Sequence, residues 1–234
     1  MNDSTGGRGE PLFNIPGIIT ALIAICAFSF ILQEYVLDSD GYIAMMLYGA
    51  FIPARYLPEY GGWDMSWLTS PFTYAFLHAS WAHLIINSVW LAAFGSPLVT
   101  RLGTARFLGF WLFSSLCAVA LHYFLHTGEM VPVVGASGAI SGMMGAAARF
   151  GFQIDRSGRM PAFQGEPLGH IECLRYRPVL TFVLIWFAVN FVTGMVGVGG
   201  GNVSQIAWEA HVGGFLAGFL VIDAFTPRRD RSYA

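Results

Sequence analysis

The sequence predicts an all-α membrane protein that crosses the bilayer six times. Hydrophobic residues make up 55% of the 234 positions and charged residues only 11%, whereas soluble domains carry about 25% charged residues. The apolar residues fall in runs of roughly 20, which is the length of helix that spans a hydrocarbon core. Lipid is therefore the main expected solvent, and membrane lipids are expected partners.

Hydropathy predicts the six membrane helices in order along the chain. They cover Gly17 to Leu37, Ala82 to Val99, Arg106 to Leu125, Val131 to Arg149, Val179 to Val198 and Ile206 to Phe225. The fourth is the least apolar, because the small residues of GASGAISGMMGAAA lower its hydropathy, although they suit close helix contact. We expect one membrane domain over residues 17–225, with cytoplasmic tails at residues 1–16 and 226–234.

The link between the first two segments, residues 38–80, is unusually aromatic for a solvated loop, with Trp63, Trp67 and Tyr74 among its residues. Aromatic side chains are enriched at membrane interfaces. We therefore expect a membrane-associated outer loop. A re-entrant segment near Tyr42 to Ile52 is the alternative, since about 11 residues are too few to span a bilayer.

Arginine placement predicts the orientation of the helices. The arginines gather in alternate links: Arg101 and Arg106, then Arg149, Arg156, Arg159, Arg175 and Arg177, then Arg228, Arg229 and Arg231. Short cytoplasmic loops are enriched in basic residues. We therefore expect these links and both termini in the cytoplasm, and the opposite links outside.

Four polar residues of three predicted helices come to a similar depth. With a helical rise of about 1.5 Å per residue, Ser137 and Asn87 lie roughly 9 Å, and His211 roughly 8 Å, below the outer ends of their segments. His83 lies one turn above Asn87. The sequence thus predicts that these groups converge near the outer face.

Their chemistry suits cleavage of a peptide bond. A serine hydroxyl is a poor nucleophile unless a base takes its proton, and the neutral imidazole of His211 could do so for Ser137. His83 and Asn87 share one helix face at i and i+4, from which they could donate hydrogen bonds to the developing oxyanion.

Each of these residues also has a structural interpretation. A single serine in a membrane helix more often packs or bonds its own backbone, and His83 with Asn87 could join helices. Glycines favour the catalytic interpretation, because Gly142, Gly214 and Gly218 clear volume between the fourth and sixth segments. Close approach of those segments would bring the serine to the histidine.

The remaining polar residues are assigned no catalytic role. Glu209 stands two residues before His211 and hence on another helix face, which predicts a Ser/His dyad rather than a triad. His122 and His126 are expected at the interface, and Asn190 is expected to serve packing.

We expect no metal, cofactor or nucleic acid. HLIIN lacks the glutamate and second histidine of the HExxH zinc pattern, and Cys26, Cys117 and Cys173 have no metal-like spacing. The arginines form no basic cluster interleaved with aromatic residues, as a nucleic-acid groove would require.

Three segments resemble the signatures of rhomboid intramembrane proteases. They are HASWAHLIIN (His78 to Asn87), GASGAISG (Gly135 to Gly142) and AHVGGFLAG (Ala210 to Gly218), in order on the second, fourth and sixth predicted helices. The resemblance covers nearly the whole chain and implies the basic six-helix bacterial form, in a bacterial inner membrane.

By this resemblance Ser137 is the nucleophile and His211 the base. His83 and Asn87 line the oxyanion hole with the backbone N–H of Ser137, and His78 has a supporting role. The implied activity is cleavage of single-pass transmembrane proteins near the outer face, without metal or ATP.

Three other functions stay open at this point. The first is a non-catalytic rhomboid-like protein that recognises or escorts membrane clients. The second is a transporter or channel, for which intramembrane charges or broken helices at the midplane would be typical. The third is a lipid hydrolase that uses the same dyad.

Overall fold

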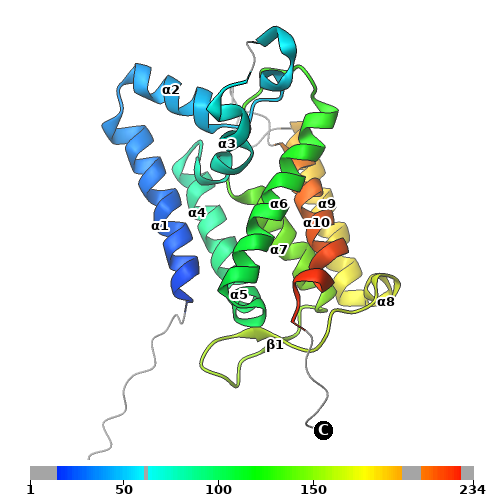
Figure 1. Cartoon of the computed structure of the whole chain (residues 1–234). Coiled ribbons are helices and arrows are strands. Elements are labelled where there is room, and N and C mark those ends of the chain that lie inside the picture. Colours follow the sequence, from blue (N-terminus) through cyan, green and yellow to red (C-terminus); the bar gives the residue numbers. More distant parts are fainter. Residues whose placement is uncertain (1–14, 61–62, 197–206, 228–234) are drawn as a thin grey trace, which may run out of the picture.

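The computed structural model describes residues 15–60, 63–196 and 207–227. Within these ranges the chain is helical apart from loops and one small antiparallel sheet. The predicted tails lie largely outside the described residues, and so does the link Gly199 to Gln205. Figure 1 shows the long helices running side by side, with shorter elements at each end of the bundle.

Five helices in the described residues are long and apolar enough to cross a membrane. They are Gly17–Val36, Trp81–Leu102, Thr104–Leu125, Arg177–Met195 and Trp208–Phe225. The elements behind them are α1 (Gly17–Ile31) with η1 (Leu32–Val36), α4 (Trp81–Trp90) with η5 (Leu91–Gly95) and α5 (Ser96–Leu102), α6 (Thr104–Leu125), α9 (Arg177–Val196) and α10 (Trp208–Phe225). The first, second, third, fifth and sixth predicted segments therefore correspond to helices of spanning length.

The fourth predicted segment contains a shorter helix, α7 (Ser137–Arg149), of 13 residues. The prediction of a helix from Val131 is wrong for its first six residues. Val133 instead forms a two-way backbone bridge with Phe51, and Gly135 has a φ of +115°, which a right-handed helix cannot contain. The chain thus reaches Ser137 in an irregular, largely extended conformation.

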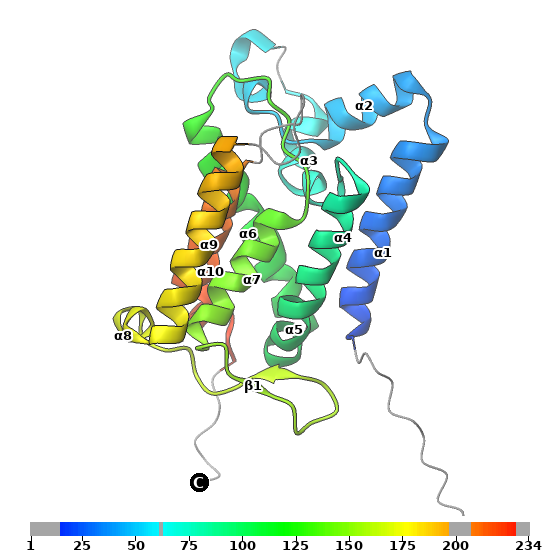
Figure 2. The ribbon, with the colours of Figure 1, turned by 180° about the vertical axis from the view of Figure 1, so that it is seen from behind.

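Helix α7 lies at the centre of the bundle, where it packs against α4, α6 and α10 (Figures 1 and 2). Every residue after Ser137 in this helix is buried. The contact with α10 is a backbone contact, because a Cβ on Gly214 or Gly218 would overlap the carbonyl oxygen of Gly138 or Gly142 respectively. Small residues therefore set the distance between α7 and α10.

The link between the first two spanning helices begins with α2 (Ser39–Gly49), which lies across the end of α1 (Figure 1). It continues through η2 (Pro53–Tyr56), η3 (Pro58–Tyr60), α3 (Met65–Thr73) and η4 (Tyr74–Phe76). Its aromatic residues pack on one another, as Tyr56 does on Phe51 and Trp67. Tyr74 is fully buried and donates to the carbonyl of Ser115 in α6 at 2.8 Å, which ties the loop to the bundle.

The opposite end of the bundle carries the small sheet of β1 (Ile154–Asp155) and β2 (Ala162–Phe163), followed by α8 (His170–Arg175). Arg149 is buried here and donates to Asp223 and to the carbonyl of Phe219, each at 2.7 Å. Helix α1 begins and α10 ends at this same end of the molecule (Figure 1).

Candidate active site

Ser137 is the first residue of α7, and the chain before it is not helical. The depth predicted for this serine assumed a helix from Val131, which the structure does not have. The irregular lead-in brings the serine to the start of the central helix instead. No side chain caps this helix, so its first N–H groups remain available at the positive end of the helix dipole.

The structure brings the predicted pair together. The Oγ atom of Ser137 lies 2.8 Å from Nε2 of His211, which is within the normal hydrogen-bond range for these atoms. His211 stands in the first turns of α10, and the glycine contacts between α7 and α10 set its distance from the serine. Both residues are partly rather than fully buried.

Asn190 of α9 binds the other nitrogen of His211, with its Oδ1 atom 2.6 Å from Nδ1. The amide Nδ2 of Asn190 donates to the carbonyl of Trp186 at 2.7 Å, so the amide oxygen faces the histidine. That oxygen can only accept. The proton of a neutral His211 therefore resides on Nδ1, which leaves Nε2 free to accept from Ser137.

The sequence predicts a packing role for Asn190, and the structure adds a hydrogen bond to His211 that the sequence did not predict. An amide in the middle of an apolar span is costly and marks a functional candidate, and this signal was present in the sequence. The sequence did not reveal that Asn190 and His211, which are 21 positions apart along the chain, come into contact between α9 and α10.

His83 and Asn87 both face the segment before Ser137. A Cβ added to Gly135 would lie 2.7 Å from Nε2 of His83 and 3.5 Å from Nδ2 of Asn87. The Nδ2 atom of Asn87 is buried and has no hydrogen-bond partner within the described residues. Two donors from α4 therefore point to the stretch of chain that leads to the serine.

His78 lies behind His83 and is almost completely buried. Its ring meets that of His83 edge to face, with 5.0 Å between the centroids, and its carbonyl accepts from Nε2 of Gln33 at 2.9 Å. Burial, with a smaller contribution from His83, lowers the pKa of His78 to about 4. This residue supports the wall of the site rather than its centre.

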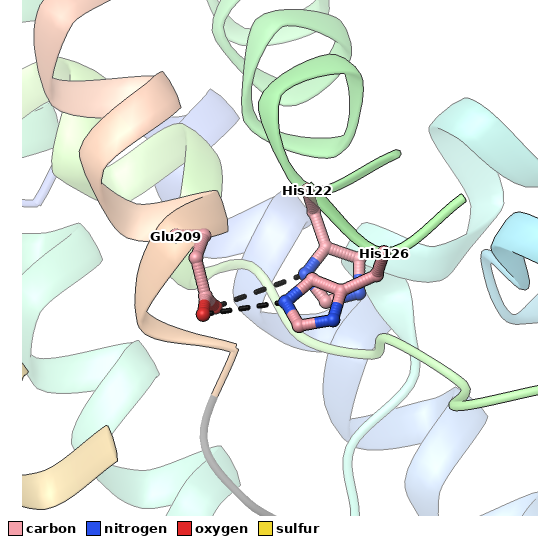
Figure 3. A group of neighbouring side chains, drawn as sticks. All are labelled: His122, His126 and Glu209. Atoms are coloured by element: carbon pink, nitrogen blue, oxygen red, sulfur yellow. Dashed lines mark ion pairs between the residues drawn. The ribbon is translucent and has the colours of Figure 1, made fainter. Parts of the chain in front are cut away.

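Glu209 points away from the Ser137–His211 pair, as the sequence predicts. Its carboxylate faces His122 at the end of α6 and His126 just after that helix, and Oε1 lies 3.3 Å from Nε2 of His126 (Figure 3). The expected interfacial position fits His126, which is partly exposed, but not His122, which is 2% exposed.

Apolar helices of spanning length around a paired serine and histidine define a multi-pass integral membrane protein with a polar site inside the bundle. The family model of the rhomboid domain matches residues 66–228. The chain therefore belongs to the rhomboid family.

Three bacterial relatives are similar at low identity. "Putative rhomboid protease YdcA" of Bacillus subtilis (strain 168) is 28% identical over 157 residues, which is 67% of this chain and 67% of the relative. "Rhomboid protease GlpG" of Enterobacter sp. is 26% identical over 208 residues, covering 88% of this chain and 62% of the relative. The protein of the same name from Pectobacterium atrosepticum is 26% identical over 170 residues, which is 67% of this chain and 52% of the relative.

Proposed function

We propose that the chain is an intramembrane serine endopeptidase that cleaves single-pass transmembrane proteins near the outer face of the membrane. Ser137 is the nucleophile and His211 its general base. The observation that carries the proposal is the 2.8 Å contact between the serine oxygen and Nε2 of the histidine. The protease names of the relatives support it.

In the proposed reaction, Oγ of Ser137 attacks the carbonyl carbon of the scissile bond while Nε2 of His211 takes the hydroxyl proton. The carbon–nitrogen bond then breaks, and the protonated histidine returns the proton to the leaving amine. An ester to Ser137 remains. Water attacks this ester, gives a proton to His211, and the serine leaves with that proton as the carboxylic product forms. These reaction steps balance in atoms and protons without a cofactor.

Three donors would stabilise the oxyanion in this reaction. They are the backbone N–H of Ser137 at the start of α7, the side-chain amide of Asn87, and His83. The unpartnered, buried Nδ2 of Asn87 supports this role, because a buried donor without a partner is costly unless it serves a ligand. Removal of one such donor typically lowers kcat by roughly 10²- to 10³-fold.

We infer that α7 also crosses the membrane, as the fourth of six membrane helices, and that the end of the bundle with α2 and α3 faces outward. Helix α7 is short because the lead-in from Val131 to Ala136 covers the outer part of the crossing. Helices α5, α7 and α8 each have an arginine in the last turn, namely Arg101, Arg149 and Arg175. These helices end at the side of the bundle where α1 begins and α10 ends (Figure 2). This arrangement favours cytoplasmic termini and, given bacterial relatives, an inner-membrane location.

The decisive experiment uses purified protein in liposomes with a panel of single-pass substrates that carry a small residue near the outer end of the span. We expect cleavage by the wild type and none by Ser137→Ala or His211→Ala. Ser141→Ala is the matched control, because Ser141 is another serine of α7, buried one turn further along the helix, and this variant should cleave normally.

Cleavage that survives in Ser137→Ala would overturn the proposal. If the wild type binds the substrates but leaves them uncut, the alternative of a non-catalytic rhomboid-like escort would replace it.

A further inference from the structure

A second cluster of titratable side chains lies beside α10, on a different face from the Ser137–His211 pair. His122 lies in the last turn of α6, His126 is the residue that directly follows this helix, and Glu209 faces both from the first turn of α10 (Figure 3). One nitrogen from each histidine and one carboxylate oxygen all lie within 4.8 Å of one another. The imidazole rings are stacked, with 4.4 Å between their centroids.

His122 is the unusual member of this cluster. It is 2% exposed, and neither ring nitrogen has a hydrogen-bond partner within the described residues. Its Nδ1 atom lies 3.9 Å from Oε2 of Glu209, which is too long for a hydrogen bond. A buried polar group without a partner is costly, so the contacts within the cluster do not account for its presence.

A cation between the three residues would account for it. Tetrahedral zinc with ligands at about 2.0–2.2 Å places two ligand atoms about 3.4 Å apart. Nε2 of His126 already lies 3.3 Å from Oε1 of Glu209, whereas Nδ1 of His122 lies 3.9 Å from the other carboxylate oxygen, Oε2. Because one ligand atom from each residue lies within 4.8 Å of the others, the largest closure that a bound zinc ion requires is about 1.4 Å. Rotation of the three side chains would supply this closure.

The surroundings of His126 match those of a zinc ligand. Its other ring nitrogen, Nδ1, lies 3.0 Å from a carboxylate oxygen of Glu129. Histidines that bind metals commonly donate their second N–H to a carboxylate, which fixes the tautomer and directs the free nitrogen to the metal. Here that arrangement directs Nε2 of His126 toward Glu209.

The donor set selects the kind of metal. Two imidazoles and one carboxylate suit zinc and neighbouring transition metals, whereas Mg²⁺ and Ca²⁺ prefer oxygen ligands. Paired histidines one helical turn apart, with a third ligand from elsewhere, are typical of zinc sites. The carboxylate also supplies a negative charge in a largely buried place, which a divalent cation would neutralise.

We propose that His122, His126 and Glu209 bind one zinc ion that joins α6 to the first turn of α10. The ion is not part of the proposed peptidase reaction, since Glu209 points away from Ser137. Its effect is on the position of α10: Glu209 stands two residues before His211, so bound zinc restrains the turn that carries the histidine. The third ligand comes from a distant helix, and for that reason the histidine pair alone gave no metal signal in the sequence.

The test uses the full chain in detergent, with any affinity tag removed and bound metals stripped by a chelator. Zinc content per chain, calorimetric titration with zinc and the apparent Tm are measured for wild type, Glu209→Gln and His126→Gln. We expect one zinc per wild-type chain and a rise in Tm of roughly 5 °C at saturating zinc. Both variants should bind about a hundredfold more weakly or not at all.

Two controls make the result specific. Glu59→Gln changes an exposed carboxylate of the outer loop and should bind zinc as the wild type does. Ser137→Ala should also bind normally, whether or not the chain is a peptidase, which separates this proposal from the proposed function. Cobalt should replace zinc with a tetrahedral absorption spectrum, and Mg²⁺ should give no shift in Tm.

The proposal is overturned if the wild type binds no zinc, or if Glu209→Gln and His126→Gln retain the wild-type affinity and Tm shift. Neither substitution is at the buried His122, so both variants are expected to fold. A variant that melts cooperatively without zinc, at the wild-type temperature, is folded, and its weaker zinc binding is then due to the missing ligand side chain.

Discussion

His211 has two ring nitrogens that face different partners, and this is the feature on which the proposed chemistry depends. Nε2 contacts the serine, and Nδ1 contacts the amide oxygen of Asn190. Because the amide nitrogen of Asn190 is held by the carbonyl of Trp186, the amide cannot turn without loss of a hydrogen bond. In the proposed reaction Asn190 is thus a positioning residue that selects the tautomer in which His211 would act as a base.

Replacement of Asn190 by alanine should lower kcat about tenfold and leave KM nearly unchanged. The loss corresponds to one hydrogen bond of about 1–2 kcal/mol that orients the base in the transition state. Steady-state cleavage kinetics with a single-pass substrate in liposomes would measure both constants.

Thr193→Ala is the matched control, because Thr193 lies one turn further along α9 and its hydroxyl, among the described residues, bonds only carbonyls of its own helix. It should retain full activity. Equal losses in both variants, or a rise in KM alone for Asn190→Ala, would show that the amide holds α9 in place rather than the base.

His78 makes the protein sensitive to acid. Its pKa in the folded protein is about 4, lowered by burial and then by His83, whereas an unfolded chain has a histidine pKa of about 6.5. As the pH falls from 6.5 to 4, the unfolded chain takes up this proton and the folded one does not. Stability due to the neutral histidine is complete above about pH 6.5 and falls by about 1.4 kcal/mol per pH unit below it.

We therefore expect His78→Gln, which removes the titrating group, to flatten the decline of Tm between pH 6.5 and pH 4. Thermal unfolding in detergent at constant ionic strength measures this slope, and the wild type serves as the reference. Parallel Tm curves for the two proteins across this range would contradict the expected role of His78.

Among the helices, the contact between α7 and α10 matters most for the site. The two backbones touch at Gly138, Gly142, Gly214 and Gly218, so no side chain separates them. Because Ser137 begins α7 and His211 lies in α10, the distance between these helices directly sets the distance between the proposed nucleophile and its proposed base. The same small residues that make α7 the least apolar segment are therefore required for its central position.

Gly218→Ala should lower the apparent Tm by roughly 5 °C and reduce cleavage strongly. Its new Cβ would overlap the carbonyl oxygen of Gly142, and such overpacking costs about 1–3 kcal/mol. The helices must then move apart, which lengthens the serine–histidine contact. Thermal unfolding and the cleavage rate of the same preparation are the measurements.

Gly109→Ala in α6 is the control for this substitution. Its Cβ would meet only the ring of Phe225 at 3.7 Å, an ordinary contact, and alanine favours a helix over glycine by about 1 kcal/mol. Its Tm should be unchanged or higher. If Gly218→Ala were as stable and active as Gly109→Ala, close packing of α7 on α10 would not be needed.

For the whole molecule, the two ends differ in both structure and charge. One end has the aromatic outer loop with α2 and α3, and the other has the β1–β2 sheet, α8 and the arginine-rich links (Figures 1 and 2). By the positive-inside rule we propose that the arginine-rich end faces the cytoplasm. Proteolysis at the dyad would then take place nearer the opposite, outer face.

Single-cysteine labelling tests this orientation. Cysteine replaces Glu59 in the outer loop or Ser157 near the small sheet, both exposed, in a chain whose native cysteines are changed to alanine. A membrane-impermeant thiol reagent added to intact cells should label Glu59→Cys and leave Ser157→Cys unlabelled. After permeabilisation both should react. Labelling of Ser157→Cys in intact cells would reverse the assignment.

Much of this architecture was predictable from the sequence. Five of the predicted segments are helices of spanning length, because hydrophobic length is a local property that each segment carries by itself. Ser137, His211, His83 and Asn87 could be selected because polar residues inside apolar runs are few. Their roles stay proposals, but the residues were visible as candidates without any coordinates.

Other features depended on contacts between distant segments, which no local pattern contains. The chain before Ser137 is extended because Val133 pairs with Phe51 and Gly135 lies against His83. Asn190 and Glu209 gain their partners only when α9 and α10 pack beside other helices. The sequence by itself determined which segments are apolar and which polar residues they contain, since these are properties of single segments. Tertiary packing alone decided which of those residues meet.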